Sequence, residues 1–229
     1  AAMEPRFMGM EWVERIPKPP KEDIIKSALG IATEGYKHQL NFLYPEVGGV
    51  EAVIKAFLKN NKGKIRTNRD INAIFYKNKK WIVVTNNGNY QYDYIVSTIP
   101  LFHLIKILKN IKVPKSVSKA INELEYRSLI TVMLGLNTPK LNNLVAIYFP
   151  DKDFLPHRVT FPPNFSSKTV PENCFSLMAE ITVPKNREYL KLSKDKIYQN
   201  VIKGLERRKI IKPNAVIYKN MQVTEYAYP

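Results

Sequence analysis

Two adjacent glycines, Gly48 and Gly49, stand directly before a run with helical spacing at Glu51 to Asn60. Glycine has no Cβ atom, so the backbone at this junction can take positive φ and let a flat ligand or another chain approach closely. The first turn of a helix also carries unpaired N–H groups and partial positive charge. The junction is therefore suited to bind an anionic or electron-rich group, although a simple strand-to-helix turn explains the same residues equally well.

Arg158 is the second residue with suggestive chemistry, because it stands in an alternating stretch, His157 to Phe161, that predicts a β-strand. A buried guanidinium is unfavourable unless it is paired, and its fork geometry fits a carboxylate or phosphate. Two interpretations therefore stay open, a substrate anion or a structural ion pair with Glu180. His38 is a candidate base or substrate contact, but a lone histidine in such a loop more often has a structural role. No residue is assigned as catalytic.

The elements that position these residues follow from the periodicity of apolar side chains. Helices are predicted at Lys21 to Leu29, Glu51 to Asn60, Leu101 to Leu108, Val113 to Leu124 and Ser193 to Arg208. Strands are predicted at Lys64 to Thr67, Asp70 to Tyr76, Lys80 to Thr85, Tyr90 to Thr98, Ser128 to Leu136, Leu144 to Phe149, His157 to Phe161, Cys174 to Thr182 and Ala215 to Gln222.

These strands and helices predict an α+β fold with a large, mainly antiparallel mixed sheet and flanking helices. The strongest local signal is the Asn-Gly turn at 87–88, which lies between two stretches rich in β-branched and aromatic residues and predicts a hairpin. The helix from Leu101 is expected to be buried, and the almost wholly apolar strand from Ser128 to be covered on both faces.

The composition limits the classes of protein to which this chain can belong. The chain has 229 residues with 45% hydrophobic and 24% charged residues, which suits one large domain or two small ones, and we expect a single domain over 1–229. The single cysteine, Cys174, excludes an internal disulfide and a thiolate metal cluster, so no metal site is expected. Neither a signal segment nor a membrane-spanning apolar run is found, which favours a cytoplasmic protein.

The formal net charge of +16 comes from lysines scattered between apolar positions. Such spacing is typical of a solvated basic face. Lysine outnumbers arginine and no recognition motif for DNA or RNA is found, so nucleic acid is an unlikely partner. A basic surface that meets a dinucleotide or a diphosphate-bearing substrate is the better specific interpretation.

The motifs between Tyr44 and Pro100 resemble those of the FAD-dependent amine oxidase and protoporphyrinogen oxidase superfamily. They are Tyr-Pro-x-x-Gly-Gly, a helix, a hairpin with Asn-Gly, and Asp-Tyr-Ile-Val-Ser-Thr-Ile-Pro at 93–100. The resemblance implies FAD as cofactor, with Gly48 and Gly49 close to the flavin. It further implies that Ile71 and Asn72 run beside the adenine and that Thr98, Ile99 and Pro100 form part of the cofactor wall.

A second set of residues is similar to UDP-galactopyranose mutases. It comprises Tyr-Phe-Pro at 148–150, Arg158 in an aromatic strand, Asn-Phe-Ser at 164–166 and the downstream Glu180. In that family the matching arginine holds the substrate diphosphate, which favours Arg158 as a substrate-binding residue. Tyr228 stands where that family has a tyrosine that contacts phosphate, and is a further substrate-binding candidate.

The chain has no Gly-x-Gly-x-x-Gly turn, which holds the FAD pyrophosphate in dinucleotide-binding domains, and no Gly-Asp segment near its C-terminal end. The resemblance therefore implies a substrate-binding domain that lacks the Rossmann half, with 42–100 including the segment that faces the missing FAD-binding segment or subunit. We expect that the chain alone neither retains FAD nor is active.

Two classes of function follow. The first is the substrate-binding part of an FAD-dependent oxidoreductase or of a flavin-dependent sugar-nucleotide mutase, acting on an anionic or amine small molecule. The second is a non-catalytic binding or interaction module that has an oxidase-like fold and no cofactor.

Overall fold

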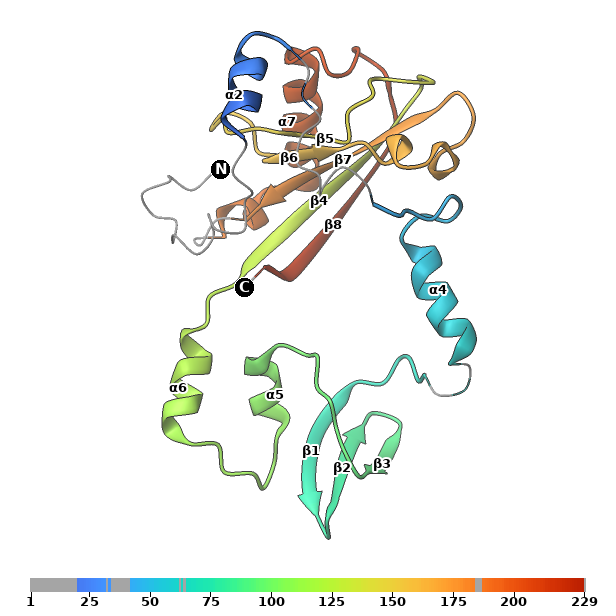
Figure 1. Cartoon of the computed structure of the whole chain (residues 1–229). Coiled ribbons are helices and arrows are strands. Elements are labelled where there is room, and N and C mark those ends of the chain that lie inside the picture. Colours follow the sequence, from blue (N-terminus) through green and yellow to red (C-terminus); the bar gives the residue numbers. More distant parts are fainter. Residues whose placement is uncertain are drawn as a thin grey trace. The chain divides into compact units, whose positions relative to one another are not determined.

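The strands of the protein are divided between two sheets, and each sheet belongs to a different compact unit (Figure 1). The computed structural model describes residues 20–31, 33, 42–61, 63, 65–183 and 187–228. Unit 1 takes in Ile130–Gln222 and the described residues up to Ile54. Unit 2 takes in Lys55–Leu129 and the residues from Val223 to Tyr228.

Unit 1 contains a five-stranded sheet with the order β5-β6-β7-β4-β8. Its strands are β4 (Arg127–Leu136), β5 (Ala146–Tyr148), β6 (Arg158–Thr160), β7 (Phe175–Thr182) and β8 (Val216–Tyr228), and the ends of β4 and β8 belong to unit 2. The helices are α2 (Lys21–Ala28), α7 (Lys194–Arg207) and the first turn of α4 (Glu51–Asn60), with short 3₁₀ helices η2 (Pro162–Asn164), η3 (Ser167–Thr169) and η4 (Glu188–Lys191).

Helix α7 and one face of this sheet form the core of unit 1. Ser193 caps the helix, because its side chain accepts a hydrogen bond from the Lys196 backbone N–H. The helix buries Ile197, Val201 and Leu205, whose spacing of four residues places them on one face. Alternate residues of β4 are buried in the same hydrophobic cluster, which gives the expected two-residue period of a strand.

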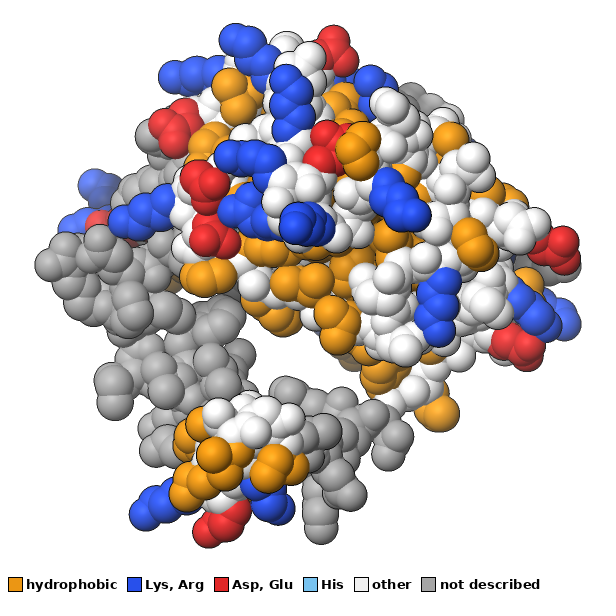
Figure 2. Space-filling view, turned by 90° about the horizontal axis from the view of Figure 1, so that it is seen from above, with side chains coloured by type: hydrophobic (Ala, Val, Ile, Leu, Met, Phe, Trp, Pro, Cys, Tyr) orange, Lys and Arg blue, Asp and Glu red, His pale blue; other side chains and the backbone are white. Residues whose placement is uncertain are grey.

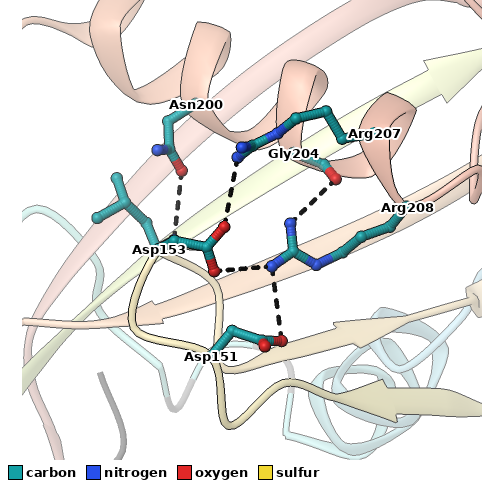
Figure 3. A network of polar contacts seen from close by, with 7 residues as sticks. Asp151, Asp153, Asn200, Gly204, Arg207 and Arg208 are labelled. Atoms are coloured by element: carbon teal, nitrogen blue, oxygen red, sulfur yellow. Dashed lines mark hydrogen bonds and ion pairs between the residues drawn. The ribbon is translucent and has the colours of Figure 1, made fainter.

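The C-terminal end of α7 is fastened to the loop before β6 (Figure 3). Arg208 donates hydrogen bonds to the Gly204 carbonyl and to Asp153, and it also pairs with Asp151. Its guanidinium lies 4.5 Å from the centre of the Phe154 ring. Phe154 in turn packs directly on Gly204, where an added Cβ would lie 2.4 Å from the ring. Close contact between this loop and the helix therefore requires glycine at 204.

Unit 2 contains a three-stranded meander, β1 (Ile71–Lys77), β2 (Lys80–Thr85) and β3 (Gly88–Tyr92), followed by α5 (Leu101–Ile107) and α6 (Lys115–Glu123). The chain after α5 runs along β1, where the Asn110 side chain both accepts from the Tyr76 N–H and donates to the Tyr76 carbonyl. Among the described residues of this unit, Ile74 is the one large apolar side chain that is fully buried.

The predicted α+β class with antiparallel pairing and flanking helices is confirmed, as is the hairpin at Asn-Gly. Four details were wrong. Residues 65–67 form no strand, and β3 ends at Tyr92 and does not continue to Thr98. Helix α5 has no fully buried residue. Strand β4 is buried on one face, whereas the residues of its other face are half-buried or, at Met133, exposed.

Basic side chains on the face of the molecule shown in Figure 2 are interspersed with acidic and uncharged ones. This distribution agrees with the scattered lysines of the sequence and does not form a continuous stripe of one charge. Within the described ranges, no helix has both the length and the apolar character needed to cross a bilayer. The same part of the chain has no group of three or more His, Cys, Asp or Glu side chains suited to a metal ion.

Candidate functional site

The Gly48-Gly49 turn has the backbone conformation that the sequence predicted. Both residues have positive φ, +84° at Gly48 and +60° at Gly49, which is a region that other residues enter only with strain. Helix α4 starts immediately afterwards, since the Ala52 N–H donates to the Gly49 carbonyl at 3.0 Å. Gly48 is exposed and Gly49 half-buried. The turn thus offers an open backbone surface beside a helix N-terminus.

The loop before this turn is held against the segment formed by η2 and η3. Ser166 Oγ donates to the Glu46 carbonyl at 2.5 Å, and Lys168 Nζ lies 2.6 Å from the Glu46 carboxylate. The rings of Tyr44 and Phe165 pack with their centres 5.2 Å apart. Unit 1 therefore brings together two motifs that lie more than a hundred residues apart in sequence, the Tyr-Pro-x-x-Gly-Gly turn and Asn-Phe-Ser.

A row of three polar side chains crosses the edge of the five-stranded sheet. The register places Tyr148 opposite Arg158, and Arg158 opposite Glu180. Their neighbours Val159 and Ala179 are fully buried in the core cluster with α7. Successive side chains of a strand point to opposite faces, so the row lies on the face of the sheet away from α7.

Arg158 forms its ion pair through one terminal nitrogen. Its Nη2 donates to both Glu180 oxygens at 2.6 Å, and Glu180 is itself only 3% exposed. Burial lowers the pKa of Arg158, but the Glu180 carboxylate and the Tyr148 side chain outweigh that effect, so the net pKa is raised and the guanidinium stays charged. Arg158 Nε is buried and has no hydrogen-bond partner among the described residues. One guanidinium N–H is therefore unsatisfied by protein groups.

His157 lies near the same carboxylate. Its Nε2 lies 3.9 Å from Glu180 Oε2, and its Nδ1 is 3.2 Å from Thr182 Oγ1. Burial lowers the pKa of His157, an effect that Glu180 partly opposes and Arg158 reinforces. At neutral pH the imidazole is therefore uncharged, and the charge pair at this site is Arg158 with Glu180.

The remaining predicted site residues are distributed over both units. In unit 2, Ile71 and Asn72 begin β1 and are exposed, and Thr98, Ile99 and Pro100 form the approach to α5. Tyr228 is the last residue of β8 and is 42% exposed. Gly48, Gly49 and Arg158 belong to unit 1. His38 lies outside the described residues.

Unit 2 contains an aromatic cluster that the sequence analysis missed. Phe102 stacks on Tyr126 with ring centres 5.5 Å apart, and Tyr226 packs against both. The Tyr226 hydroxyl also lies 3.0 Å from His103 Nε2. Burial, and then the hydrogen bond with Tyr126, raise the pKa of Tyr226. The only sequence signal for this cluster is the aromatic content of three separate segments.

Tyr148 and His157 were also missed as members of the Arg158 site. Glu180 was anticipated as the ion-pair partner, and that ion pair is confirmed. The roles of Tyr148 and His157 depend on strand register and on side-chain direction at the start of β6. Tyr148, Arg158 and Glu180 share one face because of the pairing between three strands, for which the sequence has no local signal.

Comparison with known proteins gives a consistent result. The sequence profile described as flavin-containing amine oxidoreductase matches residues 21–228. Reduced UDP-galactopyranose mutase has a similar crystal structure, with a TM-score of 0.82 and 23% sequence identity over 96% of this chain and 48% of that one. A comparison with curated proteins gave no match.

Two further solved structures are similar over a smaller share of the chain. One is a protein assigned as protoporphyrinogen oxidase from Exiguobacterium sp. 255-15, with a TM-score of 0.62 and 17% identity over 76% of this chain and 38% of that one. The other is a putrescine oxidase double mutant, with a TM-score of 0.60 and 12% identity over 76% and 38%. At these identities the likeness shows the fold. The chain spans half the length of these structures or less.

Proposed function

Because this chain belongs to the family of flavin-containing amine oxidoreductases, we propose that units 1 and 2 together form the substrate-binding domain of an FAD-dependent enzyme. The proposal includes both chemistries suggested by the sequence, oxidation of an amine or saturated ring and rearrangement of a sugar nucleotide. FAD, when bound, supplies the electron-transfer chemistry in either case. The residues of this chain bind and orient the substrate.

The residues present fit a flavin. Gly48 and Gly49 adopt positive φ with one of them exposed, so the backbone of this turn is open to a planar group without side-chain interference. In the proposed enzyme this turn lies against the flavin, with Ile71 and Asn72 beside the adenine and Thr98 to Pro100 in the cofactor wall. Since the chain covers 48% of UDP-galactopyranose mutase, the pyrophosphate cradle is proposed to come from a further segment or subunit.

The observation that carries the substrate proposal is the unsatisfied, buried Nε of Arg158. A buried N–H without a partner costs roughly 1–3 kcal/mol, which a bound anion could recover. Glu180 is bound through Nη2 alone, so Nε–H remains as a single donor for one oxygen of a carboxylate or phosphate. We propose that Arg158, with Tyr148 beside it, binds the anionic group of the substrate. Tyr228 and His38 remain candidate substrate contacts.

The test uses the complete protein that contains this chain, purified with its flavin. UDP-galactose serves as the anionic probe and putrescine as the amine probe, with binding measured by calorimetry. Arg158→Ala should weaken UDP-galactose binding by about 2–5 kcal/mol, because it removes a partly buried charge and leaves the buried Glu180 without its partner. Arg207→Ala, an exposed arginine of α7, is the matched control and should leave binding unchanged.

Three outcomes would contradict this proposal. A complete protein without flavin would contradict the cofactor assignment. Unchanged UDP-galactose affinity with a lowered melting temperature in Arg158→Ala would show that the arginine only stabilises the sheet through Glu180. The 229-residue chain alone should lose FAD on desalting, and tight retention would show that no further segment is needed.

A further inference from the structure

The two charges at the Arg158 site oppose each other at neutral pH. Both oxygens of Glu180 lie 2.6 Å from Arg158 Nη2, and this carboxylate is only 3% exposed. A buried carboxylate so close to the guanidinium offsets much of its attraction for another anion, because charges interact more strongly where water is partly excluded. An anion that binds at Arg158 would therefore be held more tightly if a second cation lay beside Glu180.

His157 lies where such a cation is needed. Its Nε2 is 3.9 Å from Glu180 Oε2, which is already within the range of an ion pair, and its Nδ1 is 3.2 Å from Thr182 Oγ1. A hydroxyl both donates and accepts hydrogen bonds, so Thr182 suits the neutral and the protonated ring. The His157 backbone donates to the Glu180 carbonyl at 2.9 Å, which fixes the base of the side chain to β7. Protonation of His157 therefore requires no change in strand pairing.

The surroundings of His157 act on its protonation in opposite directions. Burial lowers its pKa most, Glu180 of β7 raises it, and Arg158 of β6 lowers it. Tyr148 of β5 is the further titratable group of this row, and its ring centre lies 5.9 Å from the Arg158 guanidinium carbon. An anion bound at Arg158 would offset the effect of the arginine and add a second negative charge near the imidazole. The protonated imidazole would then be favoured.

We propose that the Arg158 site binds its anion together with a proton, which His157 takes up as the anion binds. The protonated imidazole pairs with Glu180, so this carboxylate opposes the anion less and Arg158 holds a phosphate or carboxylate group more tightly. This inference rests on the proposed function and adds a second residue and a proton to its substrate site. It also makes substrate affinity dependent on pH.

The direction of the pH dependence follows from linkage between the two binding events. With an anion at Arg158, the pKa of His157 is higher than in the free site, so the complex holds more protons between the two pKa values. In the free protein this pKa lies below the ordinary value of 6.5. The Kd for the anion should therefore fall as the pH is lowered towards that pKa, by at most about tenfold per pH unit for one proton, and become constant below it.

The test uses the complete flavin-containing protein and UDP-galactose, whose diphosphate does not titrate between about pH 5 and 8, where histidine does. Calorimetry in buffers of different ionisation enthalpy gives the number of protons taken up for each UDP-galactose bound. We expect uptake of up to about one proton by the unmodified protein. His157→Gln keeps a hydrogen-bonding side chain that does not ionise, so it should take up none and should bind with a weaker Kd that is independent of pH. His103→Gln, in unit 2, is the matched control and should retain the uptake.

The outcomes separate this inference from the proposed function. If the unmodified protein bound UDP-galactose without proton uptake over the whole pH range, the coupling would be overturned and the substrate site would stand. Uptake that persisted in His157→Gln would also overturn the coupling, because another group would then take the proton. If the unmodified protein did not bind UDP-galactose, the proposed anion site itself would fail and the coupling with it. The proton count of the unmodified protein decides the matter even if His157→Gln does not fold.

Discussion

The two units use their apolar residues in opposite ways. In unit 1, the sheet and α7 share a continuous cluster in which Val132, Leu136, Val159 and Leu205 are completely inaccessible. In the described part of unit 2, Ile74 is the one large apolar side chain with comparable burial, while Tyr94 and Val96 are 89% and 92% exposed. Unit 1 therefore has a core of its own, and unit 2 depends more on hydrogen bonds and aromatic pairs.

This difference has a functional meaning under the proposed function. Arg158, the main residue attributed to substrate binding, lies on the well-packed sheet, where the ion pair with Glu180 fixes its geometry. Most of the residues attributed to the cofactor lie in unit 2 or on exposed turns, whose side chains are poorly covered. Regions with few buried apolar contacts open at lower free energy than a packed core, so unit 2 should be the less stable region.

A cavity in the core of unit 1 gives the largest expected effect. Leu134→Ala should lower the free energy of unfolding by about 3–5 kcal/mol, because Leu134 is 1% exposed in the middle of β4. Its neighbour Met133, on the opposite face and 38% exposed, is the control, and Met133→Ala should cost less than about 1 kcal/mol. Urea unfolding measures both. Equal losses of unfolding free energy in the two variants would mean that both faces of β4 contribute equally to the core.

Overpacking at the contact of α7 with Phe154 should give the next largest effect. Gly204→Ala places a Cβ 2.4 Å from the Phe154 ring, so either the helix or the loop must move. We expect a loss of about 2–3 kcal/mol, despite the better helix propensity of alanine. Lys203→Ala, at the exposed neighbouring position, should be close to neutral. If Gly204→Ala were more stable than the unmodified protein, the loop that carries Phe154 would be able to move away from the helix at little cost in free energy.

Loss of the Asn110 side chain tests how unit 2 is held together. Asn110→Ala removes two hydrogen bonds to the backbone of Tyr76, each worth about 1 kcal/mol. Hydrogen exchange should become faster in β1 and β2, while β4 and β7 keep their protection. Lys112→Ala, in the same connecting segment, is the control. If protection of β4 and β7 fell by the same amount, the two units would unfold together and the contrast between them would fail.

Titration of His157 gives the smallest expected effect. Burial lowers its pKa from the ordinary value of 6.5, so the unfolded chain binds a proton at a higher pH than the folded one. Stability should therefore fall as the pH is lowered through 6.5 and continue falling until the folded pKa is passed. His157→Gln should remove this part of the acid sensitivity, measured as melting temperature against pH, whereas His103→Gln in unit 2 should retain it. If melting temperature depended on pH in the same way in His157→Gln and in the unmodified protein, His157 would be excluded as the source of the acid sensitivity.

Local structure was largely predictable from the sequence, because its causes are local. The Asn-Gly turn set the β2–β3 hairpin, and Ser193 with the four-residue spacing of Ile197, Val201 and Leu205 set α7. The positive φ of Gly48 and Gly49 was predicted in the same way, since only glycine takes that conformation without strain. The wrong predictions, burial of α5 and coverage of both faces of β4, concerned packing partners that periodicity does not reveal.

Tertiary structure decided which residues meet. Arg158 and Glu180 form an ion pair because β6 and β7 are in one particular register, and a shift by one residue would turn each side chain to the opposite face. The contact of Ser166 and Lys168 with Glu46 and the unsatisfied Nε of Arg158 likewise depend on segments distant in sequence. A residue's type and its neighbours in sequence determine its chemistry and its backbone conformation. The packing of the whole unit determines which residues it contacts.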